Sequence, residues 1–138
     1  MNELIYSINQ IESTAKLLIS AAGNKNIWLF QGEMGAGKTT LIKELSKQLG
    51  SKDDFSSPTF GIIHQYAIEN SNRFIYHIDL YRLRSEIELD QLGLSEILDS
   101  NDFVFIEWPE IAHHYMPEDH FSIQIEFDDD LTRKVLFL

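Results

Sequence analysis

The most constraining feature of this sequence is a glycine-rich loop that stands between an apolar run and a helical pattern. Residues Gly32–Thr39 match the phosphate-loop pattern G-x-x-x-x-G-K-[ST] at every fixed position. The apolar run Ile27–Phe30 stops just before the loop, and apolar residues at helical spacing begin at Leu41, just after it. This order of strand, loop and helix predicts a nucleoside triphosphate site at the carboxyl edge of a sheet.

Each part of the loop has a chemical task that its residue types explain. Glycines allow successive backbone N–H groups to turn toward one anion, and the following helix presents its positive end to the same phosphate. Lys38 is expected to reach the β- and γ-phosphates, and the Thr39 hydroxyl is expected to ligate Mg²⁺. The loop residues that we expect to bind the nucleotide are Glu33, Met34, Gly35, Ala36, Gly37, Lys38, Thr39 and Thr40.

Two acids are candidates to complete the site, because hydrolysis also requires metal ligands and a group that positions the nucleophile. Glu107 ends the fully apolar run Phe103–Ile106, and Asp79 ends the strand-like run that begins at Phe74. Burying a bare carboxylate is very costly, so Glu107 requires water, a metal or a partner. Beside bound phosphates, Mg²⁺ is the partner that we expect.

Other polar and aromatic side chains near these acids allow more than one interpretation. Thr59 lies in a proline-containing turn and is either a switch residue that senses the γ-phosphate or a hydroxyl that stabilises the turn. Arg82 and Arg84 either contact phosphate or a partner, or are solvated. Trp108 is either a core aromatic or an interface anchor. His77 is predicted to be a structural histidine, since no metal partner stands at ligand spacing.

Composition narrows the class of protein. The chain has 138 residues, of which 43% are hydrophobic and 24% charged, as in an ordinary globular protein. The absence of cysteine excludes disulfides and thiolate metal sites and fits a reducing compartment. No apolar run reaches transmembrane length and no signal-peptide pattern precedes the first strand, so we expect a cytoplasmic protein without a membrane partner. The net charge of −11 argues against strong direct binding of nucleic acid and favours a charge-complementary protein partner.

The order of elements predicts the fold class. Helices alternate with strands early in the chain, and hairpins dominate later, which indicates an α/β, three-layer, P-loop NTPase-like single domain over residues 1–138 with a mixed central sheet and a C-terminal hairpin. Asn9 is expected to cap a first helix that ends at Gly23, and a capping box at Ser85–Glu88 is expected to open a short helix. Strands are expected near residues 4–8, 27–30, 62–68, 73–80, 103–106, 121–127 and 132–138.

Four segments in this order and spacing resemble the bacterial TsaE family. They are the loop at 32–40, Ser57-Pro58-Thr59-Phe60, the run His77-Ile78-Asp79-Leu80-Tyr81-Arg82-Leu83, and Glu107-Trp108-Pro109-Glu110. The resemblance extends from the first strand to about Glu110. It implies the ATPase component of the system that makes threonylcarbamoyladenosine in tRNA.

The resemblance implies cofactors, partners and residue roles. Family members bind ATP or ADP with Mg²⁺, hydrolyse ATP slowly alone, and act with a carbamoyltransferase subunit and its paralogue, the TsaD-like and TsaB-like proteins. The modified nucleoside would be the adenosine beside the anticodon. This protein would contact tRNA only indirectly, through those partners. Transferred by motif, the catalytic residues would be Glu107, Asp79, Lys38 and Thr59, and the metal ligands would be Thr39 and Glu107. Substitution of Trp108 would impair function. The start of the first helix, near Thr14, would approach the adenine.

Three rival functions follow from the residues alone. A small P-loop kinase requires an acceptor pocket and usually an arginine-bearing lid, and no lid insertion is visible. A GTP switch requires N-K-x-D, but the segment Asn24-Lys25-Asn26-Ile27 has isoleucine where aspartate is required. A nucleotide-binding regulatory subunit without significant turnover would retain the loop but need no catalytic acid. The residues therefore favour an ATPase and leave the kinase and the regulatory subunit as alternatives.

Overall fold

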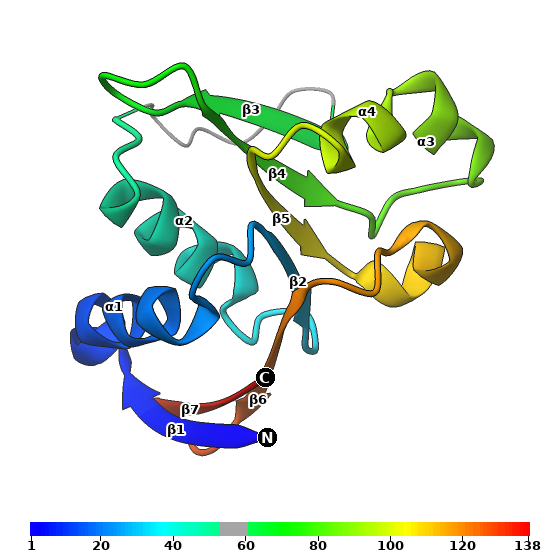
Figure 1. Ribbon diagram of the computed structural model, residues 1–138. Coiled ribbons are helices and arrows are strands. Elements are labelled where there is room, and N and C mark those ends of the chain that lie inside the picture. Colours follow the sequence, from blue (N-terminus) through cyan, green and yellow to red (C-terminus); the bar gives the residue numbers. More distant parts are fainter. Residues whose placement is uncertain (53–60) are drawn as a thin grey trace.

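A seven-stranded mixed sheet organises the computed structural model, which describes residues 1–52 and 61–138. The strand order is β1-β7-β6-β2-β5-β4-β3 (Figure 1). Strand β2 is parallel to β5 and β6, and β4 is parallel to β5, whereas the β1/β7, β6/β7 and β3/β4 pairs are antiparallel. The strands are β1 (Asn2–Ser7), β2 (Ile27–Gln31), β3 (Ile63–Ala67), β4 (Phe74–Asp79), β5 (Phe103–Glu107), β6 (Phe121–Phe127) and β7 (Thr132–Phe137). The predicted mixed sheet and C-terminal hairpin are confirmed.

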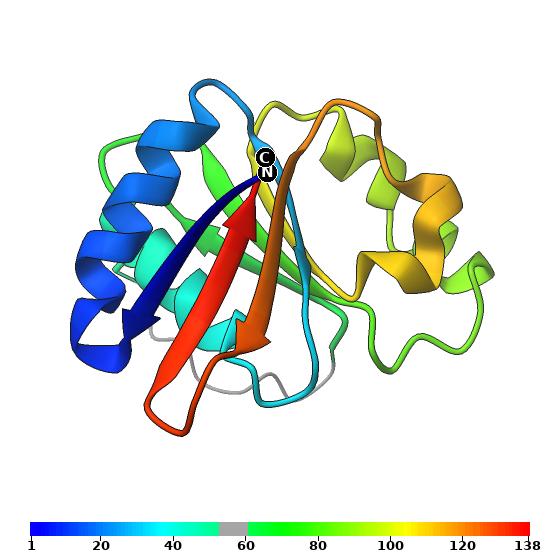
Figure 2. The same ribbon diagram turned by 90° about the horizontal axis from the view of Figure 1, so that it is seen from below.

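Helices cover both faces of the sheet, which makes three layers (Figures 1 and 2). On one face lie α1 (Ile11–Ala22) and α2 (Lys38–Gln48), which contact each other. On the other face lie α3 (Ile87–Gln91), α4 (Leu94–Leu98) and the 3₁₀ segment η2 (Pro109–Tyr115). A single 3₁₀ turn, η1 (Ile8–Gln10), leads from β1 into α1. No helix in the described ranges combines the length and apolarity that crossing a membrane would require.

The central strand shows why the apolar runs form this architecture. Trp28 and Phe30 of β2 pack in the cluster beneath α1 and α2, while Ile27 and Leu29 pack in the cluster beneath α3, α4 and η2. Successive side chains of a strand point to opposite faces, so a strand covered on both faces must be apolar at nearly every position. The Trp28 ring lies 4.8 Å from that of Phe121, on neighbouring β6. The two clusters together fix β2 in the middle of the molecule.

Several predicted helix ends differ from those in the structure. The predicted cap Asn9 lies inside η1; instead, the Ser7 backbone N–H donates to Gln10 Oε1 at 3.0 Å, because the chain enters α1 through a 3₁₀ turn. The predicted capping box at Ser85 is also wrong, since the Glu88 carboxylate accepts the backbone N–H of Arg84 at 3.2 Å. Gly23 does end α1, with a φ of 61°. The elements α4 and η2 were not predicted.

The parallel strands bring the expected site residues to one edge of the sheet. Asp79, at the end of β4, is the register partner of Glu107, at the end of β5. Phe30 of β2 pairs with the same Glu107, one residue before the strand ends at Gln31. Helix α2 begins directly after the loop that follows β2, so its N-terminus faces these two acids.

Candidate nucleotide-binding site

The phosphate loop is shaped by glycines that no other residue could replace without strain. Gly37 caps α2 with a φ of 105°, a conformation that side chains with a Cβ rarely adopt. At Gly32 an added Cβ would lie 2.7 Å from the carbonyl oxygen of Ile125 on β6, so the loop approaches the sheet too closely for a side chain. The first N–H groups of α2 therefore point out of the helix end, where an anion can accept them.

Lys38 is the first residue of α2 and is only 4% exposed. Its ammonium donates a hydrogen bond to the carbonyl oxygen of Gly32 and lies 3.5 Å from the centre of the Trp108 ring. Burial lowers the pKa of Lys38, while the nearby carboxylates of Glu107, Glu110 and Asp79 act in the opposite direction. The Lys38 ammonium therefore lies at the phosphate loop, where a phosphate bound in the loop would contact it.

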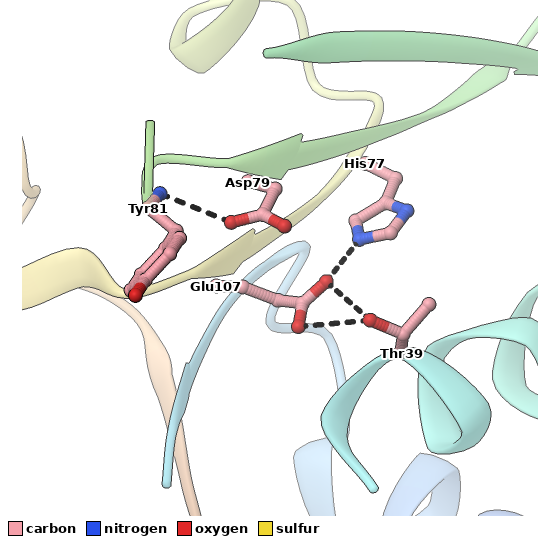
Figure 3. Close-up of polar contacts among 5 residues, drawn as sticks. All are labelled: Thr39, His77, Asp79, Tyr81 and Glu107. Atoms are coloured by element: carbon pink, nitrogen blue, oxygen red, sulfur yellow. Dashed lines mark hydrogen bonds and ion pairs between the residues drawn. The ribbon is translucent and has the colours of Figure 1, made fainter. Parts of the chain in front are cut away.

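Glu107 is the best-buried acid of the site and has two polar partners from different elements (Figure 3). The Thr39 hydroxyl of α2 lies 3.0 Å from each of its carboxylate oxygens. Nε2 of His77, on β4, lies 2.6 Å from Oε2 of Glu107. Glu107 is therefore not a bare buried carboxylate, because a hydroxyl and an imidazole contact it within the protein, and its expected ligation of Mg²⁺ stays a prediction.

Asp79 lies beside Glu107 on the neighbouring strand and is half-buried (Figure 3). Its Oδ1 accepts the backbone N–H of Tyr81 at 3.0 Å, which fixes the carboxylate at the start of the turn after β4. Asp79 also lines the pocket that contains the phosphate loop. This arrangement suits a carboxylate that orients a water molecule near bound phosphate.

One pocket gathers most of the predicted residues. It is lined by the phosphate loop, the start of α2 and the ends of β4 and β5, in full Met34, Gly35, Gly37, Lys38, Thr39, Thr40, Asp79, Tyr81, Glu107 and Trp108. Glu33 is exposed and outside this lining, although its carbonyl accepts the Ala36 N–H within the loop at 3.1 Å. The pocket thus joins the phosphate loop to both candidate acids.

A second pocket lies on the other side of the phosphate loop. It shares Gly35, Gly37 and Thr40 with the first, and its remaining lining is Tyr6, Ile8, Ile11, Ala36, Asp130, Leu131 and Arg133. Arg133 of β7 donates from Nε to the Ala36 carbonyl at 3.2 Å, which ties the C-terminal hairpin to the loop. Sequence reasoning missed this pocket, because its walls come from both ends of the chain.

Some of the predicted residues lie elsewhere. Thr14 is 2% exposed and lines neither pocket, and its expected approach to the adenine stays a prediction. Thr59 lies outside the described residues, and its role as a switch stays a prediction. Arg82 and Arg84 are exposed and line neither pocket. Trp108 is half-buried with a φ of 59°, and its ring packs 5.1 Å from that of Tyr81, so it forms a wall of the site.

His77 is the site residue that sequence reasoning assigned to a purely structural role. A signal for it existed, because side chains two positions apart on a strand share a face. His77 is two residues before Asp79, and Ile75, two residues earlier, packs in the cluster beneath α1 and α2. The same alternation in β5 places Glu107 on that face after Phe105. Residue types alone did not show that His77 reaches across to Glu107.

The donor set fits a magnesium ion bound together with a nucleotide. The Thr39 hydroxyl and the Glu107 carboxylate are hard oxygen ligands, and they meet at the pocket wall. Within the described part of the chain, no three His, Asp or Glu side chains form a group that could hold a metal ion. Such a sparse protein donor set is typical of Mg²⁺ that completes its shell with phosphate oxygens and water.

The fold and the loop together define a P-loop NTPase-like protein. The glycine-rich loop follows the central strand of a mixed sheet, precedes a helix on one face, and opens toward acids at the ends of the neighbouring strands.

Comparison with known proteins identifies the family within this class. The family model for threonylcarbamoyl adenosine biosynthesis protein TsaE matches residues 5–135. The tRNA threonylcarbamoyladenosine biosynthesis protein TsaE of Rickettsia felis is 38% identical over 130 residues, which cover 91% of this chain and 74% of that protein. The protein of the same name from Bacillus subtilis is 31% identical over 128 residues, 93% of this chain and 78% of that protein. The crystal structure of Bacillus subtilis YdiB superposes with a TM-score of 0.72 at 27% identity, covering 99% of this chain and 84% of that one. The chain belongs to the TsaE family, whose role is in tRNA threonylcarbamoyladenosine biosynthesis.

Proposed function

We propose that this protein is a cytoplasmic, magnesium-dependent ATP-binding protein and slow ATPase that supports threonylcarbamoyl modification of the tRNA adenosine beside the anticodon. It would act with a carbamoyltransferase subunit and its paralogue, proteins like TsaD and TsaB, and reach tRNA only through them. One observation carries the ATPase proposal: Lys38, Thr39, Asp79 and Glu107, from three elements, line a single pocket at the phosphate loop. Membership of the family supports the place in tRNA modification.

Each residue that lines the pocket would have its own role in ATP hydrolysis. Loop amides and Lys38 would hold the β- and γ-phosphates of ATP, and Thr39 with Glu107 would hold Mg²⁺, which neutralises charge on the phosphates when it is bound. Asp79, fixed by the Tyr81 N–H, would accept a hydrogen bond from the attacking water. Trp108 and Tyr81 would shield this end of the pocket from bulk water.

The nucleoside end of ATP would lie in the second pocket. That pocket shares loop residues with the first and offers apolar side chains, Ile8, Ile11 and Leu131, of the kind that line sites for flat organic rings. Arg133 and Asp130 would supply its polar contacts. A nucleotide that spans the loop would thus have its phosphates near Lys38 and its base near Leu131.

Two substitutions separate an ATPase from a nucleotide-binding regulatory subunit. Lys38→Ala should weaken ATP binding about tenfold or more, because a charged hydrogen-bond donor to phosphate is lost. Glu107→Ala should retain ATP binding but lower turnover about 100-fold, since Mg²⁺ and water lose their support. Glu118→Ala, which removes an exposed acid outside the pocket lining, is the matched control and should retain turnover. Affinity is measured by calorimetry and turnover by phosphate release.

Partner dependence tests the biological assignment. ATP turnover is measured with and without the purified carbamoyltransferase subunit and its paralogue, with Glu107→Ala in both arms. We expect a large stimulation in the wild-type protein and none in the variant.

Unchanged ATP affinity in Lys38→Ala would refute the proposed phosphate site, and turnover that survives in Glu107→Ala would favour a different catalytic group.

A further inference from the structure

We infer that His77 is a positioning residue for Glu107: its hydrogen bond to one carboxylate oxygen fixes the orientation of the carboxylate beside Thr39, where Mg²⁺ would bind. The inference rests on the proposed function, because it assigns a residue to the magnesium side of that site. His77 Nε2 lies 2.6 Å from Glu107 Oε2, and both side chains are almost fully buried, with 8% and 3% of their surface exposed (Figure 3).

The direction of this hydrogen bond follows from the chemistry of the two groups. An ionised carboxylate can only accept hydrogen bonds, so the proton must be on Nε2 of His77. The Thr39 hydroxyl, 3.0 Å from both oxygens, carries a single hydrogen and can donate to only one of them at a time. Because each carboxylate oxygen can accept two hydrogen bonds, Oε2 can accept from His77 while Thr39 donates to either oxygen. The bond from His77 therefore fixes the orientation of the carboxylate beside the start of α2.

The His77 ring is itself held in place by the strands around it. It lies on β4 opposite His64 on β3, with ring centres 5.8 Å apart, and His64 in turn stacks on Tyr66 at 6.1 Å. These rings limit the rotation of His77 from the side away from Glu107. A carboxylate that ligates a metal is commonly oriented by such an outer hydrogen bond, and losing the outer partner typically costs about 10–100-fold in metal affinity or activity.

A histidine that only fills space would respond differently to substitution. His77→Leu keeps apolar bulk but removes the donor, whereas His77→Gln keeps an N–H donor at a similar reach along the side chain. His77→Asn also carries an amide but is one bond shorter, so it serves as a second loss variant if His77→Leu does not fold. His114→Leu is the matched control, because it makes the same change at an exposed histidine that lines neither pocket.

The experiment measures metal and nucleotide binding separately on the full chain. Affinity for ADP is determined in EDTA, and affinity of the ADP-bound protein for Mn²⁺ is determined by electron paramagnetic resonance. We expect His77→Leu or His77→Asn to weaken Mn²⁺ binding about tenfold or more and to lower kcat. Affinity for metal-free ADP and KM should not change. His77→Gln should restore most of the Mn²⁺ affinity, and His114→Leu should retain it.

A double-mutant cycle shows whether His77 acts through Glu107. In a Glu107→Gln background, His77→Leu should cause no further loss of Mn²⁺ affinity or kcat, since the carboxylate to be positioned is gone. An equal further loss in that background would overturn the inference, as would unchanged Mn²⁺ affinity in the single variants. An equal loss of metal-free ADP affinity would show a general structural role and overturn it too. If the wild-type protein binds no ADP, the proposed function fails and the inference fails with it.

Discussion

At the scale of single residues, Lys38 has two contacts within the protein that a phosphate would replace under the proposed function. Its ammonium is held by the Gly32 carbonyl and the face of Trp108, both weaker partners than a phosphate oxygen. Burial lowers its pKa, and the three nearby acids oppose that effect. Phosphate binding would exchange these contacts for a charge-assisted hydrogen bond between the Lys38 ammonium and a phosphate oxygen.

Leu131 permits a test of where the nucleoside end binds. This side chain is 81% exposed and lines the second pocket, so Leu131→Glu should cost little stability but place a charge where a base would pack. We expect the variant to bind ATP and ADP about tenfold more weakly while binding inorganic tripolyphosphate as the wild type does, because only the phosphate half of the site remains intact. Calorimetry with each ligand measures the difference.

The control for Leu131→Glu is Leu138→Glu. Leu138 is 71% exposed and lines neither pocket, so its substitution introduces the same charge without an effect on ATP. Equal affinity of Leu131→Glu and Leu138→Glu for ATP would place the base elsewhere on the surface.

At the scale of elements, the contact between the phosphate loop and β6 depends on Gly32. A Cβ there would lie 2.7 Å from the Ile125 carbonyl, so Gly32→Ala must displace the loop or the strand. We expect a loss of about 1–3 kcal/mol in unfolding free energy, together with weaker ATP binding, because the loop amides lose their arrangement. Urea unfolding and calorimetry measure the two effects.

Gly23→Ala is the control for Gly32→Ala, because it introduces backbone strain without a steric clash. Gly23 has a φ of 61° and a ψ of −121°, a conformation that residues with a Cβ rarely adopt, but no atom lies within 4 Å of an added Cβ, so its substitution should cost about 1–3 kcal/mol of backbone strain alone. ATP affinity should be retained in that variant. A loss of ATP affinity as large as that of Gly32→Ala would contradict the role of the close approach.

The elements that sequence reasoning predicted are those whose pattern is local. Each run such as Phe103–Ile106 became a strand, because an apolar segment bounded by polar residues is buried on both faces. The cap at Asn9 failed because a 3₁₀ turn and Gln10 took its place, and Leu94–Leu98 was too short to show a helical period. Contacts such as His77 with Glu107 depend on register between strands, which no local pattern determines.

At the scale of the whole molecule, the net charge of −11 argues against direct binding of tRNA by this protein. Binding of RNA depends on neutralising phosphates with lysine and arginine, and here 11 basic residues face 22 acidic ones. We expect no tight complex of tRNA with this protein alone at physiological salt, but retention of the protein on tRNA together with its partners. Gel-shift titration with and without the carbamoyltransferase subunit and its paralogue measures this.

A tight complex formed by the isolated protein would contradict that expectation. It would also require a local basic surface strong enough to outweigh the overall charge. Loss of such a complex in high salt would then identify it as electrostatic.

The order of strands in the sheet has a consequence for how the chain acquires its structure during synthesis. Among the described strands, β2 is hydrogen-bonded to β5 and β6, and β1 only to β7, so neither has a neighbour before residue 103. Contacts between segments so distant along the chain form slowly, since a long loop must close first. The phosphate loop leaves the ribosome long before the strands that hold it in place. Until β5 and β6 emerge, the nascent chain carries the apolar strand β2 without a partner strand, so we expect this stage to be the most prone to aggregation.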